Sequence, residues 1–131
     1  MHLLPSPPPL VLLLLASTIS IFASPIADPF QRDPNEQTIV ELFNGYHYDG
    51  HRTMFHHKRW SDSGCQNLAA PDQKTTKSFR VTNGCCEFYF ERDCLKWSYM
   101  WTAYNRKDGE LEGRHRNQVT SYWCNGRTCT E

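Results

Sequence analysis

Apolar and polar residues alternate over short stretches in the second half of the chain. The clearest stretch is 97–104, where Trp97, Tyr99 and Trp101 fall on one face of an extended strand. Other short stretches rich in aromatic and β-branched residues predict strands at 78–82, 86–90 and 119–124. The dipeptide Asn83-Gly84 is a turn signal between two of them. Strands of this length and spacing are typical of an antiparallel sandwich or barrel.

The first residues have a different pattern. Residues 1–24 contain the apolar run 10–16 followed by small residues, which predicts a secretory signal peptide. The run is shorter than the ~20 apolar residues that a membrane-spanning helix needs. We therefore expect a secreted, extracellular protein without a membrane anchor.

Residues 25–59 predict a propeptide that lies mostly outside the core. Asp33-Pro34-Asn35-Glu36 is typical of a helix start, and Ile39 to Phe43 would give that helix a short apolar face before Gly45. The segment ends at Lys58-Arg59, a dibasic pair of the kind that kexin-type processing proteases cut. Cleavage there would leave a cysteine-rich β domain at 60–131.

Four histidines lie near the end of this segment, at His47, His51, His56 and His57. A metal site is one interpretation. The other is a flexible, polar processing region, which we favour because the spacing matches no defining zinc pattern.

Composition limits the protein to one small domain. The chain has 131 residues, with 14 Lys and Arg balanced by 14 Asp and Glu, so nucleic-acid binding is not expected. An even number of Cys in an exported chain indicates a disulfide framework, and each bond would stabilise the fold by ~2–4 kcal/mol. These residues are Cys65, Cys85, Cys86, Cys94, Cys124 and Cys129. The sequence leaves their pairing open, except that Cys85 and Cys86 are adjacent on a strand, point to opposite faces and should not pair with each other.

Three segments together resemble the βγ-crystallin-like Greek-key motif found in small secreted fungal proteins: 86–94, 101–109 and 116–122. The resemblance implies an all-β fold, a small disulfide-stapled antiparallel Greek-key sandwich. A full domain of this kind holds two motifs. Residues 77–81 are similar to 120–124, so they are expected to be the last strand of a shortened first motif. That motif would be stapled by Cys65 or completed by strands of a second copy in a homodimer.

The chain departs from the family pattern at two places. The hairpin of the motif normally ends in an aromatic residue, one further residue and a Gly, where this chain has Cys94, Leu95 and Lys96. A disulfide from Cys94 is expected to replace the aromatic anchor.

The second departure concerns calcium. By resemblance, Asn117, Thr120 and Ser121 would be its ligands, but Arg116 stands where the family has Asn or Asp. We expect at best a weak calcium site, and no other cofactor, because the oxygen ligands are too few.

An enzyme hypothesis has few residues to use, and we assign no catalytic residue. A secreted ribonuclease could pair His115 with a glutamate, while an arginine holds phosphate. The available glutamates are Glu87, Glu91, Glu110 and Glu112. A solvated polar loop is the favoured interpretation of the region around His115.

A binding function is better supported by the residue types. Trp97, Tyr99 and Trp101 could form an exposed row that stacks on sugars or anchors in a partner, although such a row more often fills the core of a small sandwich. Further candidate binding residues are Arg114, His115 and Arg116. We therefore expect a secreted protein that binds a protein or glycan target outside the cell, a candidate fungal effector at a host surface. An antimicrobial or killer-type toxin is the alternative within the binding class.

Overall fold

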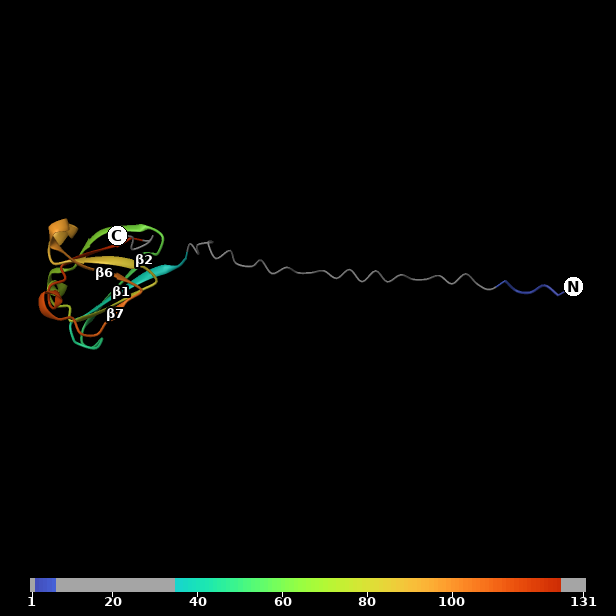
Figure 1. Ribbon diagram of the computed structural model, residues 1–131, viewed down its shortest axis with the longest axis horizontal. Helices are drawn as coiled ribbons and strands as arrows, with labels where there is room; N and C mark the ends of the chain where they lie inside the picture. The colour runs from blue at the N-terminus through green and yellow to red at the C-terminus, as the bar shows by residue number, and fades with distance from the viewer. Residues whose placement is uncertain (1, 7–34, 126–131) are drawn as a thin grey trace.

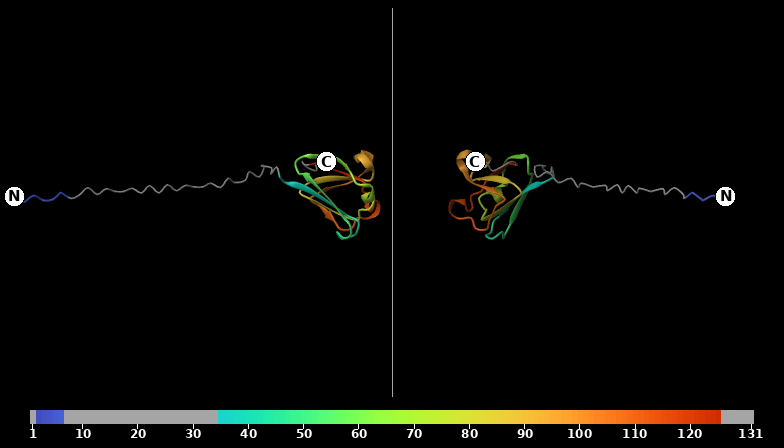
Figure 2. Two further views of the ribbon diagram at one scale, coloured as in Figure 1. Left: turned by 180° about the vertical axis from the view of Figure 1, so that it is seen from behind. Right: turned by 45° about the vertical axis from the view of Figure 1, so that its right-hand side comes forward.

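The chain folds as a sandwich of two antiparallel sheets (Figure 1, Figure 2). The computed structural model describes residues 2–6 and 35–125, and all its strands lie in the second range. One sheet has the strand order β2-β1-β4-β7 and the other β3-β8-β5-β6. The strands are β1 Gln37–Phe43, β2 Arg52–Lys58, β3 Asp62–Asn67, β4 Ser78–Thr82, β5 Cys85–Tyr89, β6 Tyr99–Tyr104, β7 Lys107–Asp108 and β8 Ser121–Asn125. Short 3-10 turns connect them: η1 Ala70–Asp72, η2 Arg92–Cys94, η3 Lys96–Ser98 and η4 Gly113–His115.

The topology is that of two interlocked four-strand motifs, β1–β4 and β5–β8. Each sheet takes three strands from one motif and the third strand of the other, β3 or β7. The fold is therefore the predicted disulfide-stapled, βγ-crystallin-like Greek-key sandwich. The four strands predicted from the sequence correspond to β4, β5, β6 and β8, with ends shifted by two residues at most.

The N-terminal segment departs from the sequence prediction. Residues 37–43 form β1, not a helix, and β1 lies inside its sheet between β2 and β4. Thr38, Ile39 and Val40 are consecutive β-branched residues, which favour a strand because their χ1 angles are restricted. The proposed start of the helix at Asp33-Pro34, like most of the expected signal peptide, lies outside the described residues.

Residues 37–58 form β1 and β2 of the folded domain, and β1 lies in its core, so the expectation of a mostly non-core propeptide is wrong for this part. Val40 and Leu42 of β1 are buried in the same hydrophobic cluster as Phe79 and Phe88. β1 and β2 supply the first two strands of the first motif. The motif is therefore not shortened, and no strand of a second copy is needed to complete its sheet.

Aromatic rings fill the space between the sheets. Phe79 of β4 lies 5.5 Å from Phe88 of β5 and 5.3 Å from Trp101 of β6, measured between ring centroids. Phe88 and Trp101 stack at 5.0 Å. Such rings bury large areas, and their offset and tilted contacts stabilise the packing further.

A polar contact inside the sandwich joins β2 to β8. His57 Nε2 lies 2.7 Å from the Tyr122 hydroxyl, and the Tyr122 ring is fully buried. Burial raises the pKa of Tyr122. Burial, and secondly the charge of His56, lower the pKa of His57. The contact is therefore made between a neutral phenol and a neutral imidazole at physiological pH.

Two disulfides hold the described part of the fold. Cys86 and Cys124 are register partners on β5 and β8, and their disulfide is buried in the core. Cys65 of β3 is bonded to Cys94 of η2. Cys85 is disulfide-bonded as well, and not to Cys86, as the sequence predicted. Cys129 lies outside the described residues.

The first motif contains an intact hairpin signature that the sequence analysis missed. Phe43 and Tyr48 pack edge to face with ring centroids 5.7 Å apart, and Gly50 follows two residues later. Gly50 has φ of 79°, and a Cβ there would lie 2.2 Å from Asn44 Oδ1, so only glycine fits. This is the pattern of aromatic, one residue and Gly that the second motif lacks.

Candidate binding cleft

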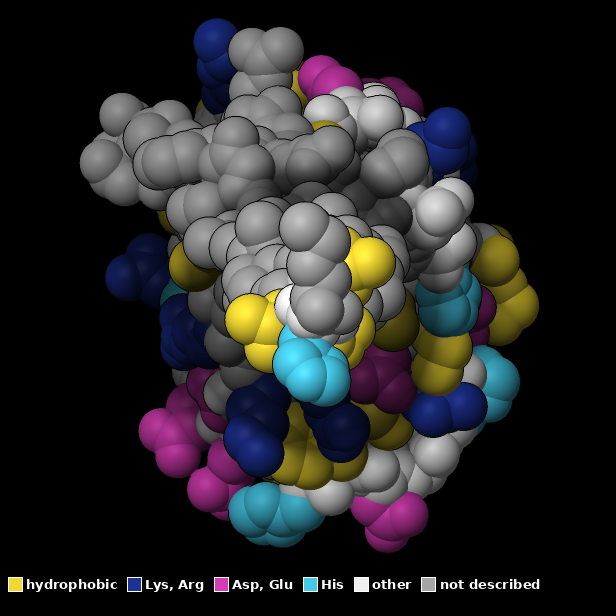
Figure 3. All heavy atoms as spheres, turned by 90° about the vertical axis from the view of Figure 1, so that its right-hand side faces the viewer, with side chains coloured by type: hydrophobic (Ala, Val, Ile, Leu, Met, Phe, Trp, Pro, Cys, Tyr) yellow, Lys and Arg dark blue, Asp and Glu magenta, His cyan; other side chains and the backbone are white. Residues whose placement is uncertain are grey.

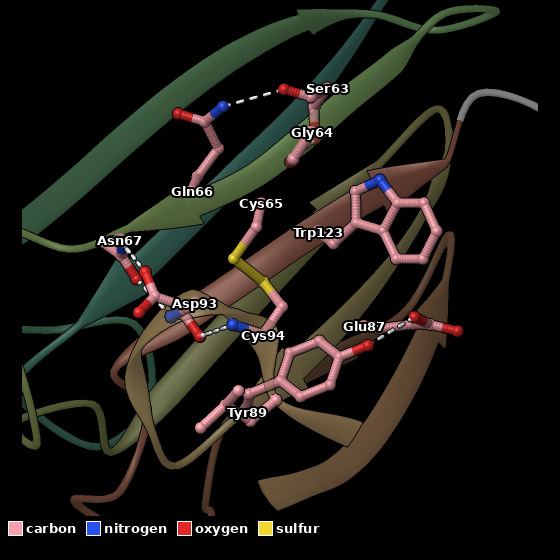
Figure 4. Close-up of a disulfide and its surroundings, with 12 residues drawn as sticks. Ser63, Gly64, Cys65, Gln66, Asn67, Glu87, Tyr89, Asp93, Cys94 and Trp123 are labelled. Carbon is pink, nitrogen blue, oxygen red and sulfur yellow. Dashed lines mark hydrogen bonds between the residues drawn. A yellow bond between two sulfur atoms is a disulfide. The ribbon is translucent and has the colours of Figure 1, made fainter.

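The hairpin between β5 and β6 is folded back onto the sheet and pinned there. Ser121 Oγ donates to the Glu91 carbonyl at 2.5 Å and accepts from the Cys94 amide at 3.1 Å. Asn67 exchanges two hydrogen bonds with Asp93, at 2.8 and 2.9 Å. The Cys65–Cys94 disulfide lies beside these contacts (Figure 4). The predicted role of Cys94 as the anchor of this hairpin is thus confirmed.

A β-bulge determines which aromatic residues of β6 reach solvent. Phe88 pairs with Trp101 but the next residue, Tyr89, pairs with Tyr99, so Met100 is the extra residue. A bulge of this kind breaks the alternation of faces. Trp101 therefore points into the core with 6% exposure, while Tyr99 is 48% exposed. Trp97 precedes the strand, in η3, and is 68% exposed. The predicted row of three aromatics on one face is wrong for this reason.

The exposed aromatics form one side of a cleft of about 750 Å³. The other side is the long loop between β7 and β8, which carries η4. The folded hairpin (orange) and this loop (orange-red) lie at the end of the sandwich opposite the start of β1 (cyan) (Figure 1, Figure 2). The lining residues are Phe90, Trp97, Tyr99, Met100, Arg114, His115 and Gln118.

The loop contributes polar side chains that make no hydrogen bond or ion pair with other described residues. Neither the Arg114 guanidinium, the His115 ring nitrogens nor the Gln118 side-chain amide makes a hydrogen bond or ion pair with another described residue. The His115 ring lies against Trp101, with centroids 5.0 Å apart, so the core aromatic holds the imidazole from beneath. The cleft is therefore apolar on one wall and hydrogen-bonding on the other, which is the usual composition of a ligand site.

Four of the six predicted binding residues meet in this cleft: Trp97, Tyr99, Arg114 and His115. Trp101 supports His115 from the core, and Arg116 points elsewhere, donating from Nη1 to the Tyr46 hydroxyl at 2.9 Å. Sequence reasoning missed Phe90, Met100 and Gln118. Their positions depend on the bulge and on the path of a loop, and neither leaves a periodic signal in the sequence.

The candidate calcium ligands do not fit that ion in this fold. Both hydrogen-bonding roles of the Ser121 hydroxyl are used to pin the hairpin. Thr120 is buried and its hydroxyl lies 3.3 Å from the Gln118 carbonyl. The described residues contain no group of three His, Cys, Asp or Glu that could hold a metal. Calcium needs six to eight oxygen ligands, and Asn117 with Thr120 falls far short.

The dibasic pair is built into the end of β2. Lys58 pairs with Gln37 in the sheet. The Arg59 amide donates to the Glu36 carbonyl at 3.0 Å, and its guanidinium bonds the Glu36 carboxylate. The guanidinium also lies 4.5 Å from the centre of the Trp60 ring. A processing protease could bind the pair only after this end of β2 had separated from the sheet. Cleavage here would therefore require local unfolding of the domain.

The histidine segment is ordered and its members are dispersed. His57 faces the core, whereas His56 of the same strand points outward, where Nδ1 lies 3.1 Å from Gln37 Oε1. His47 lies at the tip of the first hairpin, and His51 lies 3.5 Å from an Asp72 carboxylate oxygen. The segment is therefore a folded part of the domain and not a flexible region, and the four rings do not converge on a common point.

Charges of both signs are mixed over the surface. Figure 3 shows Lys and Arg side chains interspersed with Asp and Glu on the face that it displays. A smaller hollow of about 290 Å³ holds Arg80, Arg106 and Lys107. Arg80 is paired with Glu41 and Arg106 with Asp108, at 3.5 and 3.6 Å. Most of that positive charge is already compensated.

Comparison with known proteins assigns no family. Neither a scan against family models nor a search of curated proteins gives a match. Within the described residues, no helix has the length and hydropathy that a membrane crossing requires.

Proposed function

We propose that this protein is a secreted binding protein that takes up its target in the aromatic cleft, outside the producing cell. The observation that carries the proposal is the side chain of Trp97, which is 68% exposed on a hairpin held by a disulfide and four hydrogen bonds. A large ring on a rigid support loses little conformational entropy on binding, and such rings dominate binding energies.

Disulfides support the extracellular setting. They form and persist in oxidising compartments and are rare in the cytosol. Together with the predicted signal peptide and the resemblance to small secreted fungal proteins, they make an effector acting at a host surface the function that we favour. Binding fits the cleft better than catalysis because the described residues that line it include no Asp or Glu to serve as a partner for His115.

The proposal is tested by cell-surface binding of the full secreted chain. Fluorescently labelled protein is titrated onto intact plant, animal and fungal cells, and Trp97→Ala is compared with Tyr104→Ala. Tyr104 is 53% exposed but lies outside the cleft, so it is a matched control. We expect Trp97→Ala to weaken binding at least tenfold and Tyr104→Ala to leave it unchanged. Equal binding by both variants would contradict the proposal.

A ribonuclease is the second candidate, because the cleft does bring His115 and Arg114 together. It predicts RNA cleavage by the purified protein that is lost in His115→Ala. Cleavage that survives this change cannot use the cleft. A growth-inhibition assay with the same preparation separates a toxin from a host-directed effector.

A further inference from the structure

The aromatic wall of the cleft presents flat rings at an angle to one another. Phe90 and Trp97 meet edge to face, with centroids 5.6 Å apart and planes at 74°. Tyr99 is half-exposed beside them, and its hydroxyl is held 2.7 Å from Thr102 Oγ1. The apolar C–H face of a sugar ring can stack on such surfaces while its hydroxyls remain free for polar groups.

The opposite wall is positively charged and uncompensated. Among the described arginines, Arg52, Arg59, Arg80 and Arg106 are each paired with a carboxylate. Within the described residues, Arg114 makes no such pair and no Asp or Glu lines the cleft. A guanidinium donates two parallel hydrogen bonds to the oxygens of a carboxylate or sulfate. The charge of the cleft therefore fits an anionic ligand.

The size of the cleft favours an oligosaccharide over a folded protein. Its volume of about 750 Å³ lies within the range of small-ligand pockets, ~300–1,000 Å³. A stable protein partner would need an interface of roughly 1,000 Å² or more. An unbranched glycan needs only a few sugar units in contact to fill a site of this size.

We propose that the cleft binds an acidic polysaccharide, with a sugar ring on Trp97 and Tyr99 and its acid group on Arg114. The inference rests on the proposed binding function and adds the class of ligand. The Gln118 amide and the His115 imidazole complete the site by hydrogen bonding to sugar hydroxyls. An exposed guanidinium acting in this way makes the binding sensitive to salt, because its attraction is screened.

The test is isothermal titration of the full secreted chain with four probes. These are an oligogalacturonate, its methyl ester, a heparin oligosaccharide and a short poly-glutamate peptide. We expect at least one of the two acidic glycans to bind at least tenfold more tightly than both the neutral ester and the peptide. Arg114→Gln should reduce acidic-glycan binding to the level of the ester, whereas Lys107→Gln, which removes the same charge outside the cleft, should change nothing. Trp97→Ala should weaken the binding of the acidic glycan and the binding of the ester to the same extent.

Three results would overturn the inference. The first is equal affinity for oligogalacturonate and its ester, together with no effect of Arg114→Gln on heparin binding. This result would show that the cleft binds its ligand without recognising an acid group. Equal affinity for poly-glutamate and the glycans would show recognition of charge alone. No binding to either acidic glycan, combined with Trp97-dependent binding to cells, would show that the cleft works on another class of ligand.

Discussion

The two motifs of the sandwich fold their first hairpins with the same hydrogen bonds and close them in different ways. In the first, Ser78 Oγ donates to the Gly45 carbonyl at 2.6 Å and accepts from the Tyr48 amide at 3.0 Å. Ser121 does the same for Glu91 and Cys94 in the second. The backbone also repeats, since His47 and Tyr48 have positive φ, as do Asp93 and Cys94.

The closing element then differs. In the first motif, the Tyr48 ring packs on Phe43 and lies 4.7 Å from the Arg80 guanidinium. In the second, Cys94 occupies the position of Tyr48 and is bonded to Cys65. The disulfide fixes the second hairpin without an aromatic ring at this position. Trp97 of the same hairpin is 68% exposed and lines the cleft.

The largest effect is expected from removing β1 and β2, the first two strands of the first motif. A chain of residues 60–131 lacks β1 and β2, and with them Val40 and Leu42 of the core. We expect it to lose cooperative thermal unfolding, because β4 and Phe79 lose their partners in the sheet and the core. Adding a peptide of residues 35–59 should restore a transition. A cooperative transition in the truncated chain alone would contradict the account.

Removing the disulfide of the second hairpin is the next largest change. Cys65→Ala/Cys94→Ala should lower the free energy of unfolding by about 3 kcal/mol, because a cross-link over 29 residues is lost from the unfolded chain. Urea denaturation measures this change. The same variant should weaken ligand binding in the cleft, since the hairpin carries Trp97.

Tyr48→Ala removes the aromatic anchor of the first hairpin. It should lower the free energy of unfolding by about 2 kcal/mol and leave ligand binding in the cleft unchanged. Cys65→Ala/Cys94→Tyr should recover about 1 kcal/mol of the loss by restoring an aromatic anchor. Identical stability of the Cys94→Ala and Cys94→Tyr double variants would show that the two anchors are not equivalent.

The shared hydrogen bonds predict equal effects in the two motifs. Ser78→Ala and Ser121→Ala each remove a fully buried hydroxyl that bridges two backbone groups. Each should lower the free energy of unfolding by about 1–3 kcal/mol. A large loss in one variant and none in the other would show that the hairpins are held differently.

The smallest expected effect concerns pH. The pKa of His57 is lowered in the folded protein, so the unfolded chain takes up a proton first as the pH falls. Stability should be full above the ordinary histidine value of 6.5 and should decline as the pH falls below it. Melting temperatures at pH 5 and 7.5 measure the decline, which His57→Gln should reduce. His47→Asn, at an exposed position, is the control and should keep the wild-type difference.

The sequence predicted the second motif well because its signals are local. Each of these signals predicts structure without reference to distant residues. They are the short aromatic strands, the Asn83-Gly84 turn, and the adjacent Cys85 and Cys86. The first motif was misread because Lys58-Arg59 and the absence of Cys before residue 60 suggested a boundary. The signature Phe43, Tyr48 and Gly50 was present in the segment that this boundary set aside.

The sequence predicted only some of the residues of the cleft, and the reason differs from that for the first motif. Residue types identified Trp97, Tyr99, Arg114 and His115 as candidates. Their convergence depends on a bulge at Met100 and on the loop between β7 and β8, which are set by pairing with β5 and by packing on Trp101. Tertiary contacts of this kind override the period-2 pattern that a strand shows on its own.

Whether β1 and β2 remain part of the mature protein is tested most directly by its intact mass, measured in denaturant without reductant after expression of the full sequence. No Cys precedes residue 60, so a cut after Arg59 would release the N-terminal piece even with every disulfide intact. We expect a single chain that begins near residue 24 and retains β1 and β2. A mass corresponding to residues 60–131, for a protein that still unfolds cooperatively and binds through Trp97, would contradict it.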